Sequence, residues 1–456
     1  MRKIISAISI LAVLIGFAIS YGKAYADTGY DGFIKVRLTS PLKSDDKVKL
    51  YSERGFSLYC IDDLENELGF PEVNEIYAAI GDEGEIIFLD SMGEAVYSLN
   101  TEDKLVLTSK NGEEKEIKVE DRYYRGYIMF NAIGDKLIVI NYLPLEEYLY
   151  GVLPKEMGFS FHIEALKAQA IAARTYAIKN FNKHIEESYN LCDTSCCQAY
   201  GGMNVESSKT NEAVDDTKGM IITYNGYPID AVYHSNSGGH TESAEEVWGG
   251  NLPYLKGIPD EFSESYPNSR WQLKMNSKEI EDKLYNNSID VGKVMDIIIL
   301  DTTANGRVKE LMIVGDKGNE TISGNEFRSI IGTTTLKSAF FTVSKEKIYD
   351  KEIKIYSVDN NGQIKTINLN DVNIIDGDGN IKSIDGFSSI ITYRGVKNID
   401  LETTPVTLNF TIDGKGYGHG VGMSQWGAQG MAVYGYSFEE ILKYYYNGID
   451  IEGVEG

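Results

Sequence analysis

The stretch GYGHGVGMSQWGAQG, from Gly416 to Gly430, is the most distinctive segment of this 456-residue chain. Glycine loses more conformational entropy on folding than any other residue, so folded proteins keep many glycines together where the backbone turns sharply or passes close to another group. A flexible linker would be rich in glycine and serine alone, whereas this stretch also contains tyrosine, histidine, methionine and tryptophan. We therefore predict a structured loop in which His419, Ser424 and Gln425 contact a ligand, with Trp426 suited to stacking on a sugar ring.

The N-terminus has the pattern of a targeting segment. Two basic residues precede an apolar run from Ile4 to Ser20, and a small-x-small sequence follows at Ala24–Ala26. This order is typical of a secretory signal. Because the apolar run lies at the lower edge of the length that spans a bilayer, an uncleaved membrane anchor stays open as the alternative. In either case residues 1–26 place the rest of the chain outside the cytoplasm, secreted or associated with the cell wall or membrane.

The charge balance is strongly acidic. Asp and Glu number 68 against 44 Lys and Arg, which gives a formal net charge of −24. Such a surface argues against nucleic acid and anionic membranes as partners. A neutral or weakly charged polymer fits better, and the 31 tyrosines suit contact with carbohydrate, although β-rich secreted proteins also contain many.

The chain predicts an α+β fold, with a β-rich catalytic domain that contains several helices. Residues 27–125 are predicted to form a small accessory β domain, because apolar and polar residues alternate in Phe33–Leu38 and Val48–Tyr51. Residues 126–450 form the second domain, which includes an amphipathic helix at about 163–181. Residues 344–408 differ in composition and carry Asn-Gly and Asp-Gly turns, so they are predicted to be an inserted β unit.

Glu156 is the candidate catalytic residue. It lies in the segment Pro154–Gly158, after a predicted short helix at 145–153 that the proline interrupts. Apolar neighbours such as Met157 would raise the pKa of the carboxyl group and let it act as a general acid near neutral pH. The alternative is an ordinary solvated glutamate.

Lys167 and Arg174 are candidate substrate-binding residues on the helix that follows. They are seven residues apart and therefore project from nearly the same side. Arg174 lies beside a stripe of alanines, where a charge must be paired or must face a cleft. Two interpretations stay open: both cations line a groove beside Glu156, or Arg174 belongs to a structural ion pair.

A second group of candidate substrate-binding residues follows a predicted strand. His234, Ser237 and His240 belong to a loop that is rich in serine, glycine and asparagine and is expected to rim a cleft. Trp248 and Tyr254 come next and are suited to stacking on sugar rings; the alternative for Trp248 is a core residue. A metallohydrolase that uses His234, His240 and His419 is another functional class, although Asp/His motifs with helical spacing are missing.

The cysteines form a local cluster. His184, Cys192, Cys196 and Cys197 have a spacing that allows a zinc site with thiolate and imidazole ligands. A disulfide from Cys192 to Cys196 or Cys197 is the competing interpretation in an oxidising compartment, and free thiols are the third.

Four motifs in this order make the chain resemble the SpoIID/LytB family of cell-wall proteins, found chiefly in spore-forming bacteria. The resemblance covers about 130–450, apart from the insertion at about 344–408. The matching stretches are Leu143–Met157, Leu166–Tyr176, Tyr233–His240 and Gly416–Gly430.

The resemblance implies that the substrate is peptidoglycan. In the best-understood branch of the family, a lytic transglycosylase cleaves glycan strands that have lost their stem peptides and works together with an amidase during engulfment of the forespore. The family's catalytic glutamate falls on Glu156, and its supporting Lys and Arg fall on Lys167 and Arg174. Some members hold structural zinc in the Cys-Asp-Thr stretch, often with His where this chain has Cys196. The N-terminal domain and the insertion point toward a paralogue or the amidase-modifier branch.

The mechanism expected from this resemblance needs no cofactor. Glu156 protonates the oxygen between N-acetylmuramic acid and N-acetylglucosamine, and then acts as a base to close a 1,6-anhydro ring. A single carboxylate is sufficient, in contrast to the two carboxylates of hydrolases. The alternative is a non-catalytic wall-binding modifier that stimulates an N-acetylmuramoyl-L-alanine amidase.

Overall fold

The computed structural model describes most of the chain outside its N-terminus. The signal or anchor predicted at 1–26 lies outside the described residues, and so do the Asn-Gly and Asp-Gly turns of the predicted insertion. Side chains are described outside 347–407. Within this described part, no helix has both the length and the apolar character needed to cross a membrane. The described residues are 30–39, 42, 47–100, 103–110, 116–349, 354–358, 364–368, 373–375, 381–383, 388–392, 395–399 and 406–453.

The chain forms two compact units. The first comprises Met1–Pro267 and Gly420–Gly456, and the second comprises Asn268–His419. This division differs from the predicted one, in which 126–450 formed one domain. The second unit has a hydrophobic core of its own, built around Phe327 and Phe410, so it is more than a short insertion.

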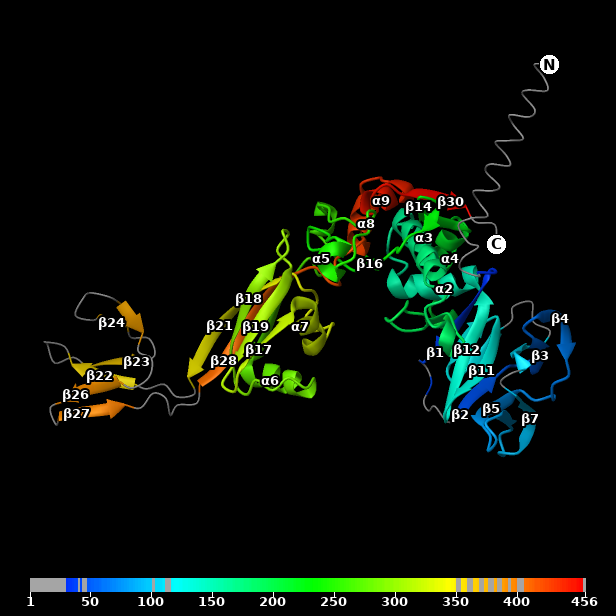
Figure 1. Ribbon diagram of the computed structural model, residues 1–456, viewed down its shortest axis with the longest axis horizontal. Helices are drawn as coiled ribbons and strands as arrows, with labels where there is room; N and C mark the ends of the chain where they lie inside the picture. Colours follow the sequence, from blue (N-terminus) through cyan, green and yellow to red (C-terminus); the bar gives the residue numbers. More distant parts are fainter. Residues whose placement is uncertain are drawn as a thin grey trace, which may run out of the picture. The chain divides into compact units, whose positions relative to one another are not determined.

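Two antiparallel β layers build one part of the first unit (Figure 1). Their strand orders are β13-β1-β12-β11-β8-β3-β4 and β10-β9-β2-β5-β6-β7. The strands are β1 (Phe33–Leu38), β2 (Lys47–Tyr51), β3 (Phe56–Cys60), β4 (Asp63–Leu68), β5 (Glu75–Ile80), β6 (Ile86–Leu89), β7 (Ala95–Leu99), β8 (Leu105–Ser109), β9 (Glu116–Val119), β10 (Arg122–Arg125), β11 (Tyr127–Ile133), β12 (Lys136–Pro144) and β13 (Leu191–Cys192).

The predicted boundary at 125/126 is not a division of this unit. β1 pairs with β12 in antiparallel fashion from Phe33↔Pro144 to Leu38↔Val139, and it pairs in parallel with β13. The alternating residues of β1 are buried on one face, as the period of two predicted. The strand β12 is buried along nearly its whole length and lies between β1 and β11, so the N-terminal segment is an integral part of this sheet.

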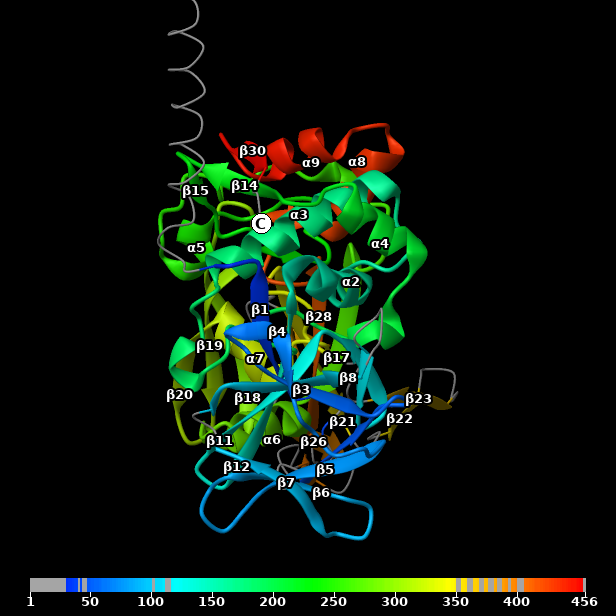
Figure 2. The same ribbon diagram turned by 90° about the vertical axis from the view of Figure 1, so that its right-hand side faces the viewer.

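Helices and short sheets form the rest of the first unit, at one end of β11 and β12 (Figures 1 and 2). The helix α3 is buried on most of its surface. Its many alanines have small side chains, so neighbouring helices can approach it closely. The elements are α2 (Leu145–Glu156), α3 (Ile163–Lys179), α4 (Ser208–Asp215), α5 (Ala244–Trp248), α8 (Gln425–Val433), α9 (Phe438–Tyr445), the 3₁₀ turns η2 (Ile185–Glu187), η3 (Gly202–Val205) and η4 (Glu261–Ser263), the sheet of β15 (Tyr227–Pro228), β14 (Met220–Tyr224) and β30 (Asp450–Gly453), and the parallel pair β16 (Tyr233–His234) and β29 (Met423–Ser424).

Pro154 does not end the helix that contains it. The helix α2 continues from Leu145 to Glu156, so Glu156 is its last residue. A proline within a helix removes the hydrogen bond of its own nitrogen, but the Met157 N–H beyond it still donates to the Leu153 carbonyl at 2.8 Å. The predicted corner therefore lies one turn later, and the helix carries Glu156 to it.

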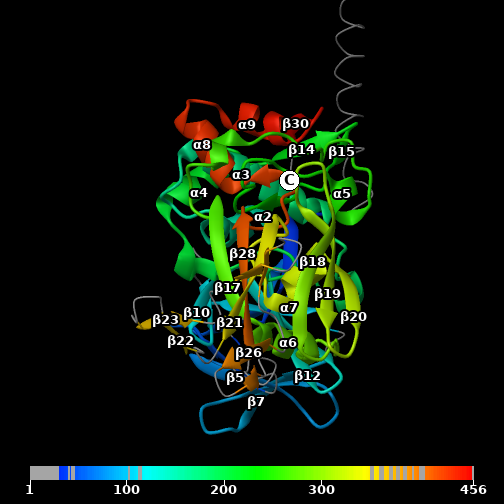
Figure 3. The ribbon, with the colours of Figure 1, turned by 90° about the vertical axis from the view of Figure 1, so that its left-hand side faces the viewer.

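The second unit is also of mixed α and β structure (Figure 3). The strand β28 pairs with β21 from Phe341↔Gly414 to Tyr349↔Val406, so the segment between them leaves and returns through neighbouring strands. Both units together confirm the predicted α+β class. The elements are β17 (Arg270–Asn276), β18 (Val294–Thr302), β19 (Val308–Gly315), β20 (Asn319–Ser323), β21 (Phe341–Tyr349), β28 (Val406–Lys415), α6 (Ser277–Asn286), α7 (Gly324–Ile331) and the hairpins β22 (Lys354–Val358)/β23 (Ile364–Asn368), β24 (Asn373–Ile375)/β25 (Ile381–Ser383) and β26 (Ser388–Thr392)/β27 (Gly395–Ile399).

Candidate active site

Glu156 lies where three segments of the first unit meet. It is half-buried at the end of α2. Its Oε1 atom accepts a hydrogen bond of 3.1 Å from the backbone N–H of Ala199, and the side chain of Gln425, the first residue of α8, is its second polar partner. The residue as a whole is only partly buried, so we expect a substrate to be able to reach it.

Burial raises the pKa of Glu156. The Ala199 N–H, the Gln425 side chain and the charge of Lys155 all favour the carboxylate and oppose this shift, but desolvation outweighs them. Tyr148 and Tyr233 lie close enough for their ionisation to be disfavoured by the charge of Glu156, although burial is the larger cause of their raised pKa values. The site therefore holds the proton of this carboxyl group to a higher pH than water does.

The raised pKa of Glu156 predicts how stability depends on pH. A carboxyl group whose pKa rises on folding stabilises the fold at low pH, and this contribution is lost as the pH rises through the folded-state pKa. Glu156→Gln removes the titration and keeps an oxygen that can accept from Ala199. We therefore expect the variant to match the wild type in stability at about pH 4 and to exceed it at about pH 8, as measured by urea unfolding. Parallel pH profiles for the two proteins would contradict the burial of this group.

A buried glutamine fixes the position of Gln425. The Gln425 Nε2 atom donates to Oε1 of Gln169 at 3.4 Å. Gln169 belongs to α3 and is fully buried. Because this bond uses one hydrogen of the Gln425 amide group, the amide nitrogen is held in the interior beside Glu156, where its other hydrogen can donate to the carboxylate.

The loop that supplies Ala199 was missed by sequence reasoning. It follows the cysteine cluster directly, and its Gln198 side chain donates from Nε2 to the Tyr233 hydroxyl at 3.0 Å and to the Ala173 carbonyl at 3.3 Å. A backbone N–H gives no side-chain signal in a sequence, so Ala199 could not have been found. Its closeness to Cys197 was the one available hint.

Arg174 is held in a buried ion pair with Glu146, which favours the structural interpretation over the predicted substrate role. Its guanidinium group is 1% exposed and forms a bidentate ion pair with Glu146, at 2.8 Å from Nε and 2.6 Å from Nη2. Its remaining bonds go to the carbonyl groups of Met220 and Val214. The interpretation as a structural ion pair is the one the structure supports.

Lys167 also forms ion pairs with acidic side chains. Its Nζ atom lies 2.9 Å from Asp216 and 3.6 Å from Glu164, and the hydrogen bond with Asp216 is the main cause of its raised pKa. The structure gives this side chain no hydrogen bond or ion pair with Glu156.

Several residues predicted to bind substrate instead hold loops together. Ser237 and Ser424 are fully buried; Ser424 caps α8 by accepting from the Gly427 N–H at 3.2 Å, and it also accepts from the Ser237 N–H at 3.3 Å. His234 is buried, with Nδ1 3.0 Å from the Val421 carbonyl. Tyr254 is buried and donates to Asp230 at 2.9 Å, so its ring is not available for stacking on a sugar.

The other predicted contacts lie at or near the surface. Trp248 is 51% exposed at the end of α5, so it is not a core residue. His240 is half-buried and bridges to Pro259 through its backbone. His419 is the last residue of the second unit. Among the described residues, none of the histidines proposed for a metallohydrolase belongs to a group of metal ligands.

Asp260 is a second carboxyl group whose pKa is raised by burial. It is fully buried, and it accepts from Ser237 at 2.6 Å and from Tyr445 at 2.8 Å. Because no part of it reaches solvent, it cannot act on a polymer. Within the described residues, Glu156 is therefore the accessible carboxyl group with a raised pKa.

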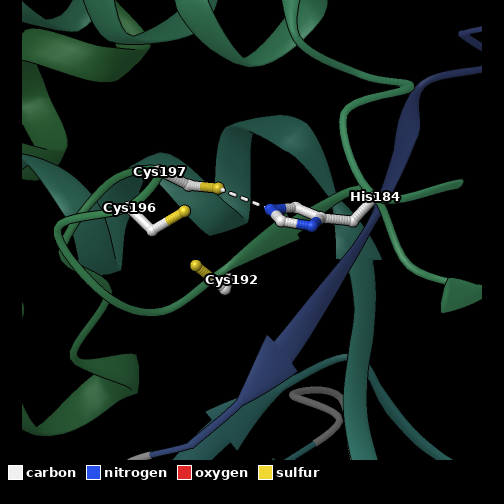
Figure 4. Close-up of side chains that lie close together, drawn as sticks. All are labelled: His184, Cys192, Cys196 and Cys197. Carbon is white, nitrogen blue, oxygen red and sulfur yellow. Dashed lines mark hydrogen bonds between the residues drawn. The ribbon is translucent and has the colours of Figure 1, made fainter.

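The cysteine cluster brings its four predicted side chains together (Figure 4). The possible ligand atoms of His184, Cys192, Cys196 and Cys197 all lie within 4.8 Å of one another, and the cysteines are free thiols. Tetrahedral zinc with sulfur at about 2.3 Å needs ligand separations of about 3.8 Å, so small side-chain movements suffice. Glu187 lies 3.1 Å from Nδ1 of His184 and leaves Nε2 facing Cys197 at 3.5 Å, as second partners of metal-bound histidines do.

Comparisons with known proteins agree with the motifs. A family described as Stage II sporulation protein matches residues 134–224, and a domain of unknown function matches 259–363. An uncharacterized protein of Brachyspira hyodysenteriae is 31% identical over 72% of each chain. In Bacillus subtilis, stage II sporulation protein D is 30% identical over 68% of this chain and 74% of its own length. The amidase enhancer of that species is 33% identical over 66% of this chain but 39% of its own length.

Proposed function

Since this chain belongs to the SpoIID/LytB family of cell-wall proteins, we propose that it is a lytic transglycosylase of peptidoglycan that acts outside the cytoplasm in cell-wall remodelling linked to sporulation. The proposal depends mainly on the burial and the raised pKa of Glu156. The residue is half-buried, and burial raises the pKa of its carboxyl group. These are the properties of a general acid that works near neutral pH.

The proposed reaction uses Glu156 twice. First, the protonated carboxyl group gives its proton to the glycosidic oxygen, and the bond to C1 of N-acetylmuramic acid breaks with an oxocarbenium-like centre left behind. The carboxylate then takes the proton of the C6 hydroxyl of the same sugar, and that oxygen bonds to C1. The product has a 1,6-anhydro end, and the proton returns to Glu156.

The surrounding groups suit both halves of this cycle. Desolvation keeps the carboxyl group protonated for the first step, and the Ala199 N–H and the Gln425 side chain stabilise the carboxylate that the first step leaves. A hydrolase that uses two carboxylates places them about 5 to 10 Å apart. The groups that shift the pKa of Glu156 are the Ala199 N–H, Gln425 and Lys155, and none of them is a second carboxylate, which suits the single-carboxylate route.

A digestion tests the proposal. Peptide-free glycan strands are incubated with the full chain, and the soluble products are analysed by mass spectrometry. We expect fragments that end in anhydro-N-acetylmuramic acid. Reducing ends would indicate a hydrolase, and the absence of any cleavage would contradict the enzymatic proposal.

The second candidate function is stimulation of a cell-wall amidase. It is favoured by the similarity to the amidase enhancer of Bacillus subtilis. Under this alternative, Glu156→Gln stimulates an N-acetylmuramoyl-L-alanine amidase on whole peptidoglycan as well as the wild type does. Under the transglycosylase proposal, any gain in amidase rate depends on Glu156, because cleaved strands give the amidase access.

We also propose that the cysteine cluster binds a structural zinc ion. Four converging thiol and imidazole groups are the donor set that zinc prefers. Cys197 lies two residues before Ala199, so holding this loop also holds the N–H group that contacts Glu156. The metal would have no part in the reaction steps.

The zinc proposal predicts that the purified chain contains about one zinc ion per molecule. Cys192→Ser should lower the zinc content and the melting temperature, because the closed site no longer has its four ligands. Cys60→Ser is the matched control, since Cys60 lies in β3 outside the cluster. Zinc content is measured by elemental mass spectrometry and stability by thermal unfolding. An intramolecular disulfide within the cluster of the native protein would contradict the proposal.

A further inference from the structure

A row of aromatic residues continues from the loop after Glu156. Trp426 packs against Phe161 of that loop in a tilted arrangement, with ring centroids 4.5 Å apart, and stacks on Tyr266, with centroids 5.1 Å apart. Trp426, Gly430 and Tyr434 are spaced four residues apart, so they lie on one face of α8 and its end. At 1.5 Å per residue, Tyr434 lies about 12 Å along the helix from Trp426.

Phe262 of η4 packs beside Tyr434 and Gly430. It packs directly on Gly430, where an added Cβ atom would lie 2.4 Å from the Phe262 carbonyl oxygen. Three tyrosine rings meet Phe262 edge-on, at centroid distances of 5.9 Å for Tyr434, 5.7 Å for Tyr436 and 5.9 Å for Tyr444. We call Trp426, Tyr266, Phe262, Tyr434, Tyr436 and Tyr444 the aromatic stripe.

Two members of the stripe are exposed, and the backbone that carries them is firmly held. Tyr434 is 77% exposed and Tyr436 is 38% exposed. The Tyr434 N–H donates to Gly430 at 3.1 Å and the Tyr436 N–H to Met431 at 3.1 Å, and the Tyr444 hydroxyl donates to Pro259 at 2.7 Å. Contiguous exposed aromatic surface of this kind marks an interaction site, and a fixed backbone lowers the entropy lost on binding.

We infer that the aromatic stripe binds the glycan strand beyond the bond that is cut and guides it along α8 toward Glu156. The inference rests on the proposed function. Trp426 and Tyr434 follow each other along α8, and Trp426 packs against Phe161 of the loop after Glu156, so the stripe can continue a polymer site that begins at Glu156. The exposed rings of Tyr434 and Tyr436 can pack against the C–H surfaces of sugars, and their hydroxyl groups can contact sugar hydroxyl groups.

Charge favours stacking as the source of this binding. The chain carries a net charge of −24, and a peptide-free strand carries a carboxylate on each N-acetylmuramic acid. Attraction between opposite charges therefore cannot hold the two together. Because salt screens repulsion between exposed charges, we expect binding at the stripe to be unchanged or stronger at high salt.

A sedimentation experiment tests the stripe separately from the chemistry. The full chain with Glu156→Gln serves as the parent, so binding to insoluble peptide-free glycan is measured without cleavage. We expect the added pair Tyr434→Ala and Tyr436→Ala to weaken binding about tenfold, and the pair Tyr434→Phe and Tyr436→Phe to retain most of it. Tyr227→Ala is the matched control, since Tyr227 is 55% exposed in β15 and should bind like the parent.

The second measurement is the kinetics of cleavage, with Glu156 present so that the protein is active. The alanine pair should raise KM for long strands and leave kcat unchanged, because it removes contacts made equally before and during the reaction. Undiminished glycan binding by the alanine pair would overturn the inference while leaving the proposed function intact. Normal glycan binding with loss of amidase stimulation would overturn it in favour of a protein-docking surface. Failure of the parent itself to bind glycan would contradict both proposals.

Discussion

Glu156→Gln is expected to reduce the cleavage of peptide-free glycan by about 100- to 10,000-fold, the usual contribution of a general acid and base. The amide has nearly the same shape and keeps an oxygen for the Ala199 N–H, but it has no proton to give. Because substrate contacts are retained, we expect KM to change little while kcat falls. Initial rates of strand cleavage, measured from newly formed ends, check this prediction.

Glu212→Gln is the matched control for that experiment. Glu212 is exposed on α4, and the same change of carboxylate to amide there should leave the rate unaltered. If Glu156→Gln retained the wild-type rate, the carboxyl group would not be the acid, and the amidase-modifier function would become the better account.

Arg174→Leu is expected to cost about 3 kcal/mol of folding stability, because removing one partner leaves the other charge of a buried pair uncompensated. Glu146 would lose two hydrogen bonds, and the carbonyl groups of Met220 and Val214 would lose their donor. Urea unfolding at neutral pH measures the loss. Glu146→Gln should also destabilise the fold, and the double variant should cost less than the sum of the two single changes.

The Arg174 prediction separates the two roles that the sequence left open. In preparations kept below their unfolding temperature, we expect Arg174→Leu to bind peptide-free glycan as the wild type does. A variant that folds with full stability but no longer binds glycan would show that the guanidinium group contacts substrate after all.

The sequence predicted some parts of the site well and others poorly, for physical reasons. The raised pKa that the sequence predicted for Glu156 is found in the structure, because the carboxyl group is buried. The cysteine cluster was identified because its members lie close along the chain, so local geometry brings them together. Ala199 contributes a backbone N–H group, and this contribution cannot be recognised from the residue type in a sequence.

Other predictions failed because burial depends on distant partners. Arg174 was known to need a partner, but Glu146 lies 28 residues away, and the sequence gives no sign of the pairing. The hydroxyl groups of Ser237 and Ser424 could equally well contact a ligand or hold two loops together. Only the fold shows that both residues are fully buried. The α+β class was correct, whereas the extent of the second unit was missed because β28 closes it from far along the chain.

The most direct test of the central claim is the origin of the oxygen at the new chain end. The full chain is incubated with peptide-free glycan in water enriched in the heavy oxygen isotope, and the products are weighed by mass spectrometry. If Glu156 donates its proton to the leaving oxygen and then activates the C6 hydroxyl, the new ends are anhydro sugars that contain no heavy oxygen from water. New ends that carry label from water would contradict the account.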